Sequence, residues 1–293
     1  MRQPRPITTG LLRDWELPRS GGSKESQGRV LVVGGNVRMP GGVLLAAEAA
    51  MRAGAGKLQV ATVEQVAVPM AMQVPEAYVA GLPADADGNL APESAAEIVE
   101  LAADCSAVLL GPGIMSPDSA VALLSEVVPQ LAVPVVVDAL GMAYLTEHRD
   151  GVAHLDGRAI LSPNLGELAV TLGLDQDEVS DDPLTHARRL ATDARAVVVT
   201  GAATTVICTP DDAACWQDES GGEGMAVSGS GDVKAGVLLG LLGRGATPEQ
   251  AAAWGAFVHG RAGERLVAVH GRRGYLAREL LVEIPRTLAE LDG

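Results

Sequence analysis

The sequence has few aromatic residues and few cysteines. Aromatic side chains make up 2% of the 293 residues, whereas hydrophobic residues as a whole make up 47%. Ala, Val and Leu must therefore fill the core of a folded globule, which favours helices packed on a buried sheet over an aromatic-rich β-sandwich. The three cysteines, Cys105, Cys208 and Cys215, form no C-x-x-C pair. This argues against a disulfide framework or a zinc site and predicts reduced, packed thiols.

The sequence also lacks a basic stripe and a long apolar run, and we expect no signal peptide. Its 22 basic and 37 acidic residues give a net charge of −15, so we expect no nucleic-acid binding. No apolar stretch reaches the roughly 18 residues that a membrane span needs. The basic N-terminal segment "MRQPRPITTG" has no apolar segment behind it. We therefore expect a cytoplasmic protein that does not bind membranes.

Several familiar catalytic motifs are absent as well. The stretch "GAGKL" (54–58) lacks the hydroxyl residue that a P-loop has after its lysine, and G-x-G-x-x-G fails at 229–234 because its sixth residue is Lys234. No G-x-S-x-G or H-E-x-x-H occurs, and the five histidines are scattered, so we assign them no ligand role. The chemistry must come from another pattern.

Short apolar runs alternate with helical patterns along most of the chain. The pattern predicts strands at 29–35, 57–62, 106–113, 133–140, 157–164 and 195–202, and helices at 41–54, 92–103, 117–128, 166–173 and 184–193. Residues 204–209 and 213–218 are expected to form an antiparallel hairpin at the sheet edge, and the chain after 231 to be almost entirely helical.

This alternation predicts one α/β domain over residues 28–293. We expect a three-layer sandwich in which helices cover both faces of a mostly parallel central sheet. Residues 1–27 are polar and rich in Pro, Gly and Ser. They are expected to be an N-terminal arm that lies on the surface or on a neighbouring subunit.

Glycine and polar residues collect where the predicted strands end. Ligands bind at the carboxyl ends of the strands in such sheets. These ends carry Gly34–Asn36, Gly111–Gly113, Asp138, Pro163–Glu167 and Thr200–Thr204.

The stretch "SGSGD" (228–232) is a possible anion cradle. Gly229, Ser230 and Gly231 let the backbone approach an anion, and a helix expected from about Asp232 onward would point its free N–H groups at the same place. Asp232, kept ionised by the helix end and therefore low in pKa, would accept a hydroxyl proton during phosphoryl transfer. The alternative is that Asp232 only caps the helix.

Two further stretches also allow two interpretations. In "SPNLGE" (162–167), Glu167 can hold Mg²⁺ through water and Asn164 can contact a phosphate or substrate oxygen, or the pair can form a capping box. In "TGAAT" (200–204), small residues can line an adenine–ribose pocket or form a simple turn. This second stretch consists of Thr200, Gly201, Ala202, Ala203 and Thr204.

The order of these motifs resembles that of the ADP/ATP-dependent NAD(P)H-hydrate dehydratases, a branch of the ribokinase-like fold. The matching stretches cover nearly the whole chain after residue 27: "GRVLVVGGNVRMPGGVLLAAEAAMRAGAGKLQVAT" (28–62), "LLGPGI" (109–114), "VVVDAL" (135–140), "LSPNLGE" (161–167), "VVVTGAATTV" (197–206) and "GMAVSGSGDVKAG" (224–236). The resemblance implies repair of damaged nicotinamide cofactor: ADP or ATP, with Mg²⁺, phosphorylates the hydroxyl of the hydrated ring, and loss of phosphate then restores NADH or NADPH. It also implies a tetramer.

The resemblance implies roles for individual residues. Asp232 would be the base and a substrate contact, and Gly42, Gly113 and Asn164 would line the site of the hydrated cofactor. Nucleotide binding would fall to residues 200–204 and to the Gly229–Gly231 loop, with Gly231 at the phosphates.

Three positions depart from the family pattern. The family usually has His at the position of Asn164, Lys at that of Thr200, and Asn at that of Gly141. Asn164 with Glu167 also spells the N-x-x-E of ribokinase-like kinases, which keeps a small-molecule kinase as an alternative function. The missing lysine at Thr200 favours a third alternative, a nucleotide-binding protein without turnover.

Overall fold

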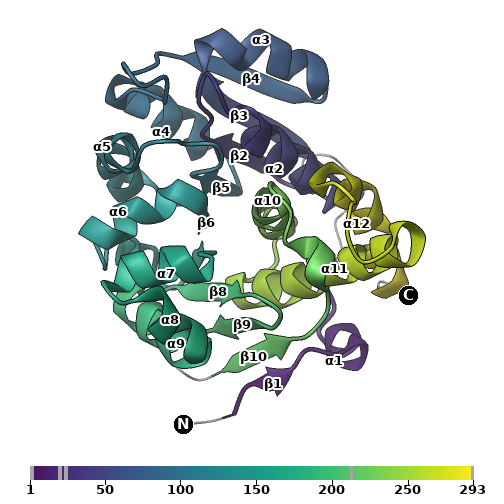
Figure 1. The fold of residues 1–293 in the computed structure, drawn as a ribbon. Helices are drawn as coiled ribbons and strands as arrows, with labels where there is room; N and C mark the ends of the chain where they lie inside the picture. The colour runs from purple at the N-terminus through teal and green to yellow at the C-terminus, as the bar shows by residue number, and fades with distance from the viewer. Residues whose placement is uncertain (1–2, 19–21, 23–25, 212–213, 292–293) are drawn as a thin grey trace.

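A ten-stranded sheet runs through the centre of the molecule (Figure 1). The structure is a computed structural model that describes residues 3–18, 22, 26–211 and 214–291. The strand order is β1-β10-β9-β8-β7-β6-β5-β2-β3-β4, and neighbours are parallel except that β9 runs antiparallel to β8 and β10. The strands are β1 (Arg5–Pro6), β2 (Arg29–Val33), β3 (Lys57–Val63), β4 (Ala77–Leu82), β5 (Ala107–Leu110), β6 (Val135–Val137), β7 (Ala159–Leu161), β8 (Val197–Gly201), β9 (Thr205–Cys208) and β10 (Cys215–Asp218).

Helices cover both faces of this sheet (Figure 1). One face carries α2 (Gly41–Arg52), α10 (Ser230–Gly243), α11 (Pro248–His270) and α12 (Ala277–Leu291). The other carries α4 (Ala95–Ala103), α5 (Pro117–Val127), α6 (Met142–Glu147), α7 (Leu165–Leu172), α8 (Gln176–Asp181) and α9 (Pro183–Ala194). The short α1 (Thr9–Asp14) follows β1, and α3 (Glu64–Gln73) packs beside β4.

The buried strands explain the continuous apolar runs of the sequence. Along β2, Val30 and Val32 enter one core, whereas Leu31 and Val33 enter the other. A strand buried on both faces needs apolar side chains at every position.

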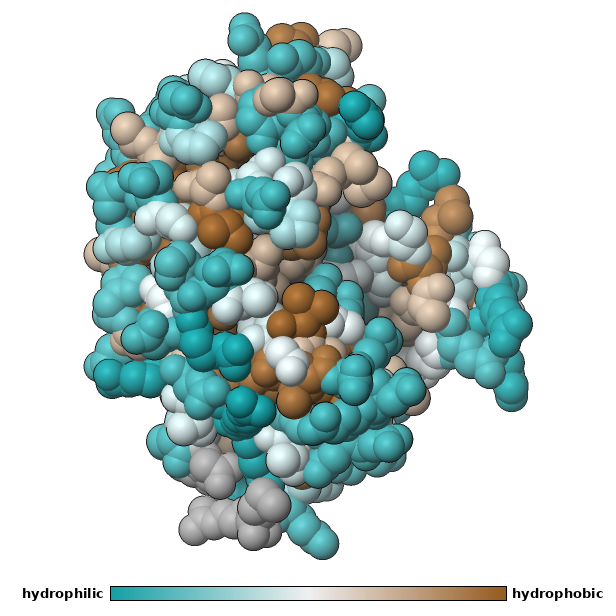
Figure 2. Space-filling model, turned by 60° about the vertical axis from the view of Figure 1, so that its left-hand side comes forward, coloured by the Kyte–Doolittle hydropathy of each residue, from teal (hydrophilic) through white to brown (hydrophobic). Residues whose placement is uncertain are grey.

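Hydrophilic residues dominate the molecular face in Figure 2, where hydrophobic residues gather mainly near its centre. No helix in the described ranges is long and apolar enough to cross a membrane.

Glycines let α10 pack closely on α2. A Cβ atom on Gly236 would lie 2.3 Å from the carbonyl oxygen of Ala46, and one on Gly240 would lie 2.4 Å from that of Ala50. Larger side chains would push the two helices apart. This close packing sets the position of the first turn of α10, which carries Asp232.

The predicted architecture is confirmed. Each predicted strand and helix is present. Most are shorter than predicted, whereas β3 and α9 are longer and α7 is shifted by one residue. β9 and β10 form the predicted antiparallel hairpin, although residue 213 lies outside the described residues. Its placement at the sheet edge was wrong, because β1 pairs in parallel with β10 and forms the outer strand. The predictions did not include β1, α1, α3, β4, α6 or α8.

Residues 3–18 of the predicted arm pack on the sheet of their own chain. Leu12 and Leu17 are buried, and the ring of Trp15 stacks on that of Trp216 in β10 at a centroid distance of 5.6 Å. Trp254 Nε1 donates to the Trp15 carbonyl at 3.0 Å. This part of the arm therefore extends the hydrophobic core.

Candidate active site

Three predicted site residues from different parts of the chain meet at the carboxyl edge of the sheet. They are Gly42 in the first turn of α2, Gly113 after β5, and Asp232 in the first turn of α10. A Cβ atom on Gly42 would lie 2.9 Å from Asp232 Oδ1 and 3.0 Å from the backbone nitrogen of Gly113. The Asp232 carboxylate therefore lies directly against the backbone of Gly42.

The Gly229–Gly231 loop places an open backbone beside this carboxylate. Gly229 has φ of 90°, and a Cβ there would lie 2.5 Å from Leu45 Cδ1, so the fold itself requires glycine. Gly231 is exposed, and a Cβ on it would meet nothing within 4 Å. Packing therefore does not explain why residue 231 is a glycine. The space over Gly231 is open, so an anion can approach the free N–H groups of the first helical turn.

The start of α10 tests the interpretation of Asp232 as a helix cap. The helix begins at Ser230, two residues before the predicted start, and its N-cap residue is Gly229. Asp232 is therefore inside the first turn, and α10 has no side-chain cap hydrogen bond. The interpretation of Asp232 as a helix cap was wrong.

The pKa of Asp232 is raised to about 6, first by burial and then by the negative charge of Glu167. This corrects the expectation of a low pKa. The helix N-terminus favours the charged form by only about 0.3–1 kcal/mol, and the loss of hydration outweighs it. A carboxyl group that titrates near neutral pH is better suited to accept a proton than one that titrates near 4.

Asp138, Glu167 and Lys234 form a charged cluster with Asp232. Burial raises the pKa of Asp138 to about 8, Lys234 opposes this shift, and Glu167 and Asp232 add to it. Burial also raises the pKa of Glu167 and lowers that of Lys234. From the sequence, Asp138 was identified only as a strand end, and Lys234 had no predicted role. The signal for Lys234 was a single charge within the apolar stretch "VKAGVLLGLL" (233–242).

Asn164 and Glu167 form the capping box of α7. Asn164 Oδ1 accepts from the Glu167 N–H at 2.8 Å, and the Asn164 N–H donates to Glu167 Oε2 at 2.9 Å. In the described part of the chain, no three His, Cys, Asp or Glu side chains are grouped so that they could hold a metal ion. The capping interpretation is confirmed, and the magnesium and substrate roles of this pair stay predictions.

The 200–204 stretch forms a tight turn from β8 into β9. Gly201 has φ of 142°, and a Cβ there would lie 2.0 Å from the Thr204 carbonyl oxygen. Ala202, Ala203 and Thr204 are exposed, whereas Thr200 is fully buried, with a hydroxyl that has no hydrogen-bond partner. The turn is confirmed, and contact with a nucleotide remains a prediction.

A half-buried histidine of α11 lies beside the cradle. Ser230 Oγ lies 3.1 Å from His259 Nε2. Burial lowers the pKa of His259 to about 3, and the charge of Lys234 adds to this shift, so the imidazole is neutral. The sequence analysis assigned no histidine a role, because no local spacing connects His259 with Ser230.

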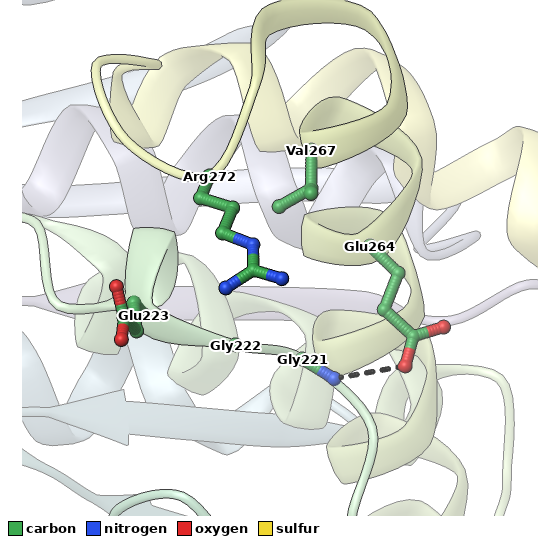
Figure 3. Close-up of a pocket in the computed structure, with 6 residues that line it drawn as sticks. All are labelled: Gly221, Gly222, Glu223, Glu264, Val267 and Arg272. Atoms are coloured by element: carbon green, nitrogen blue, oxygen red, sulfur yellow. Dashed lines mark hydrogen bonds between the residues drawn. The ribbon is translucent and has the colours of Figure 1, made fainter.

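A cavity of about 290 Å³ opens beside the loop that leads into the cradle (Figure 3). Its lining consists of Gly221, Gly222, Glu223, Glu264, Val267 and Arg272. The Arg272 side chain points into the cavity between the two glutamates (Figure 3), and the Gly221 N–H donates to Glu264 Oε1 at 3.3 Å. Glu264 lies on α11, the helix that also carries His259.

We expect Gly231→Ala to weaken nucleotide binding while the fold is retained. The added methyl group meets no protein atom within 4 Å but fills the open side of the cradle. We expect KM for the nucleotide to rise about tenfold, equivalent to about 1.4 kcal/mol, with an unchanged or higher melting temperature. The companion Gly229→Ala should lower the melting temperature, because of its φ and its contact with Leu45. A native nucleotide KM in Gly231→Ala would show that no phosphate lies against this glycine.

Comparison with known proteins identifies the family of this chain. The family model for NAD(P)H-hydrate dehydratase matches residues 30–286. The chain belongs to this family. The ADP-dependent (S)-NAD(P)H-hydrate dehydratase of Xanthomonas campestris is 40% identical over 287 residues, which cover 98% of this chain and 97% of that protein. The chain spans about half the length of the bifunctional NAD(P)H-hydrate repair enzymes that it also matches, 52% in one case.

Solved structures agree with this assignment. The Bacillus subtilis ADP/ATP-dependent NAD(P)H-hydrate dehydratase, co-crystallized with ATP/Mg²⁺, has a TM-score of 0.81 and 26% identity, over 99% of this chain and 100% of that one. A ribokinase-like superfamily protein from Enterococcus faecalis has a TM-score of 0.83 and 22% identity, over 99% of this chain and 97% of that one. The resemblance found in the sequence and the ribokinase-like fold are both confirmed.

Proposed function

We propose that this chain is an ADP- or ATP-dependent (S)-NAD(P)H-hydrate dehydratase that returns hydrated nicotinamide cofactors to NADH and NADPH. The observation that carries the proposal is the position of the Asp232 carboxylate against Gly42, whose Cβ would also meet the Gly113 nitrogen, one residue from the open backbone of Gly231. Proton acceptor and anion cradle are thus adjacent. The Xanthomonas campestris relative bears this name at 40% identity over nearly the whole chain.

The geometry supports a phosphorylation followed by an elimination. The first-turn N–H groups of α10 would hold the terminal phosphate of the nucleotide. Asp232 would accept the proton of the ring hydroxyl as its oxygen attacks that phosphorus, and the shortened nucleotide would leave. Loss of inorganic phosphate and of a ring proton would then restore the double bond. In balance, hydrated cofactor and ATP give reduced cofactor, ADP and phosphate. With ADP as the phosphate donor, the products are reduced cofactor, AMP and phosphate.

We place the rest of the nucleotide between the cavity lined by Glu264 and Val267 and the turn at 202–204. The carboxylates of the cavity can accept hydrogen bonds from ribose hydroxyls. Asn164 stays a proposed substrate contact, because it is exposed next to Glu167.

We propose that Mg²⁺ accompanies the nucleotide. Burial is the main cause of the raised pKa values of Asp138, Glu167 and Asp232, and the charge of Glu167 adds to the shifts of Asp138 and Asp232, so an added positive charge here would interact favourably with their carboxylates. Mg²⁺ usually keeps several waters and binds through substrate phosphates and one or two carboxylates. Glu167 would hold it through water, and the ion would neutralise charge on the transferred phosphoryl group.

We also propose a homo-oligomer that works in the cytoplasm. Val68, Met72 and Tyr78 expose 70%, 77% and 60% of their surface on α3 and the neighbouring edge strand β4. Such an apolar group at a sheet edge supports an interface between subunits, which sedimentation analysis would test. The three reduced thiols support the cytoplasmic setting.

We expect Glu167→Gln to move the acidic limb of the pH–rate profile to lower pH. The native rate should rise as pH increases through about 6, because Asp232 must be deprotonated to act as a base. Without the neighbouring negative charge, Asp232 loses its proton at lower pH. Glutamine preserves the capping box, so the melting temperature should change little, whereas the Mg²⁺ concentration for half-maximal rate should rise severalfold. An unmoved profile and an unchanged Mg²⁺ requirement would restrict Glu167 to capping α7.

The products distinguish the proposed dehydratase from a small-molecule kinase and from a protein without turnover. With hydrated NADH, Mg²⁺ and ADP or ATP, we expect the absorbance of reduced nicotinamide to return and phosphate to appear in an equal amount. A kinase would instead release a stable phosphate ester from a sugar or vitamin alcohol while hydrated NADH stayed unchanged. Binding of nucleotide without any product would support the third alternative.

A further inference from the structure

Cys208 and Cys215 face each other across the β9–β10 hairpin. They are direct partners in the strand register, and the Cys215 thiol donates to Cys208 Sγ at 3.0 Å. The Thr209 N–H donates to the Ala214 carbonyl at 3.2 Å, so the adjacent pair 208/215 is of the non-hydrogen-bonded type, in which Cα atoms are about 4.5 Å apart. This separation lies within the range that a disulfide spans, about 4.4–6.8 Å.

A guanidinium group lies beside this pair. Arg188 of α9 is 8% exposed, and its Nε donates to Cys215 Sγ at 3.2 Å. A neighbouring positive charge stabilises the thiolate, which is the reactive form of cysteine. By contrast, the hydrogen bonds of Cys105 are with uncharged groups: its thiol donates to the Leu101 carbonyl, and Gln59 Nε2 donates to its sulfur.

We propose that Cys208 and Cys215 are a dithiol oxidation site that hydrogen peroxide converts into an intrachain disulfide between β9 and β10. The Cys215 thiolate attacks a peroxide oxygen, which gives a sulfenic acid and one water. Cys208 sulfur then attacks the Cys215 sulfur, the S–S bond forms, and a second water leaves. Two thiols and one hydrogen peroxide thus give one disulfide and two waters. Both sulfurs are buried, so a small oxidant can reach them more easily than the thiol or disulfide of another protein can.

The position of the pair separates this site from the proposed chemistry. Cys208 ends β9, whereas Thr205 begins it next to the 202–204 turn. A disulfide at 208/215 would join the two strands at the end of the hairpin away from that turn. The proposal does not depend on the catalytic function.

Peptide mapping of the full-length protein tests the proposal. The folded protein is treated with hydrogen peroxide, quenched in acid, unfolded and alkylated. Trypsin leaves both cysteines in one peptide, 196–234. We expect this peptide to carry no alkyl group and to weigh two hydrogens less than the reduced form. After the chain is cleaved before Asp211, the disulfide should hold the fragments with Cys208 and Cys215 together until it is reduced. Two alkylated thiols, a sulfinic acid at either position, or linkage to Cys105 would overturn the proposal.

Single variants provide the matched controls. In Cys215→Ala, Cys208 should remain alkylatable after the same treatment. Cys105→Ala removes a buried thiol elsewhere in the fold and should form the 208–215 link at the native rate. A tenfold slower link in Cys105→Ala would assign the reaction to thiol exchange through Cys105 and overturn direct oxidation of the pair.

Discussion

Asp232→Asn is expected to fold and bind nucleotide but to lose most of its turnover. The amide has the shape of the carboxylate but cannot take the proton of the substrate hydroxyl, so kcat should fall by roughly 10²–10⁴-fold. The carboxylate lies against Gly42, and its pKa is raised to about 6. Both features fit a proton acceptor and not a helix cap.

The measurement must separate chemistry from folding and from binding. Steady-state rates above pH 7 give kcat, where the native Asp232 is ionised, and calorimetry gives the affinity for nucleotide. Since α10 has no side-chain cap hydrogen bond, the substitution should leave the melting temperature nearly unchanged. Turnover at the native rate would remove Asp232 from the mechanism, whereas lost nucleotide binding would make it a binding residue.

The inner strands of the sheet could be predicted because a strand that is buried on both faces has a continuous apolar run in the sequence. β2, β5 and β6 are clear examples. The edge elements carry weaker signals. α3 contains Pro69 in its interior, which argues against a helix in the sequence. β1 has two residues, too few for any periodicity, and therefore appeared to belong to an arm.

The site could be predicted in part. The residues at the strand ends and the Gly229–Asp232 stretch were identified from local sequence, and the spacing of Asn164 and Glu167 indicated their capping box. The electrostatics could not be predicted, because the pKa of Asp232 depends on burial and on Glu167 from another helix. For the same reason the sequence did not indicate the contact of His259 with Ser230, which only the packing of α11 creates.

Gly42→Ala is expected to reduce kcat by about one to two orders of magnitude without unfolding the protein. The new methyl carbon would lie 2.9 Å from Asp232 Oδ1 and 3.0 Å from the Gly113 backbone nitrogen. The backbone cannot yield easily, so the carboxylate must shift. Misplacement of a catalytic group by about 1 Å costs on the order of 10²-fold. Alanine in a helix is more stable than glycine by about 0.5–1 kcal/mol, which offsets part of the steric cost.

The neighbouring glycine provides the matched control. Gly41 begins the same helix, is exposed, and would place a Cβ within 4 Å of nothing. Gly41→Ala should therefore keep native kcat and a native or higher melting temperature, so any difference between the variants reports the contact with Asp232 and not helix propensity. If Gly42→Ala also turned over at the native rate, the carboxylate would tolerate displacement, and its position against Gly42 would not be what sets the rate.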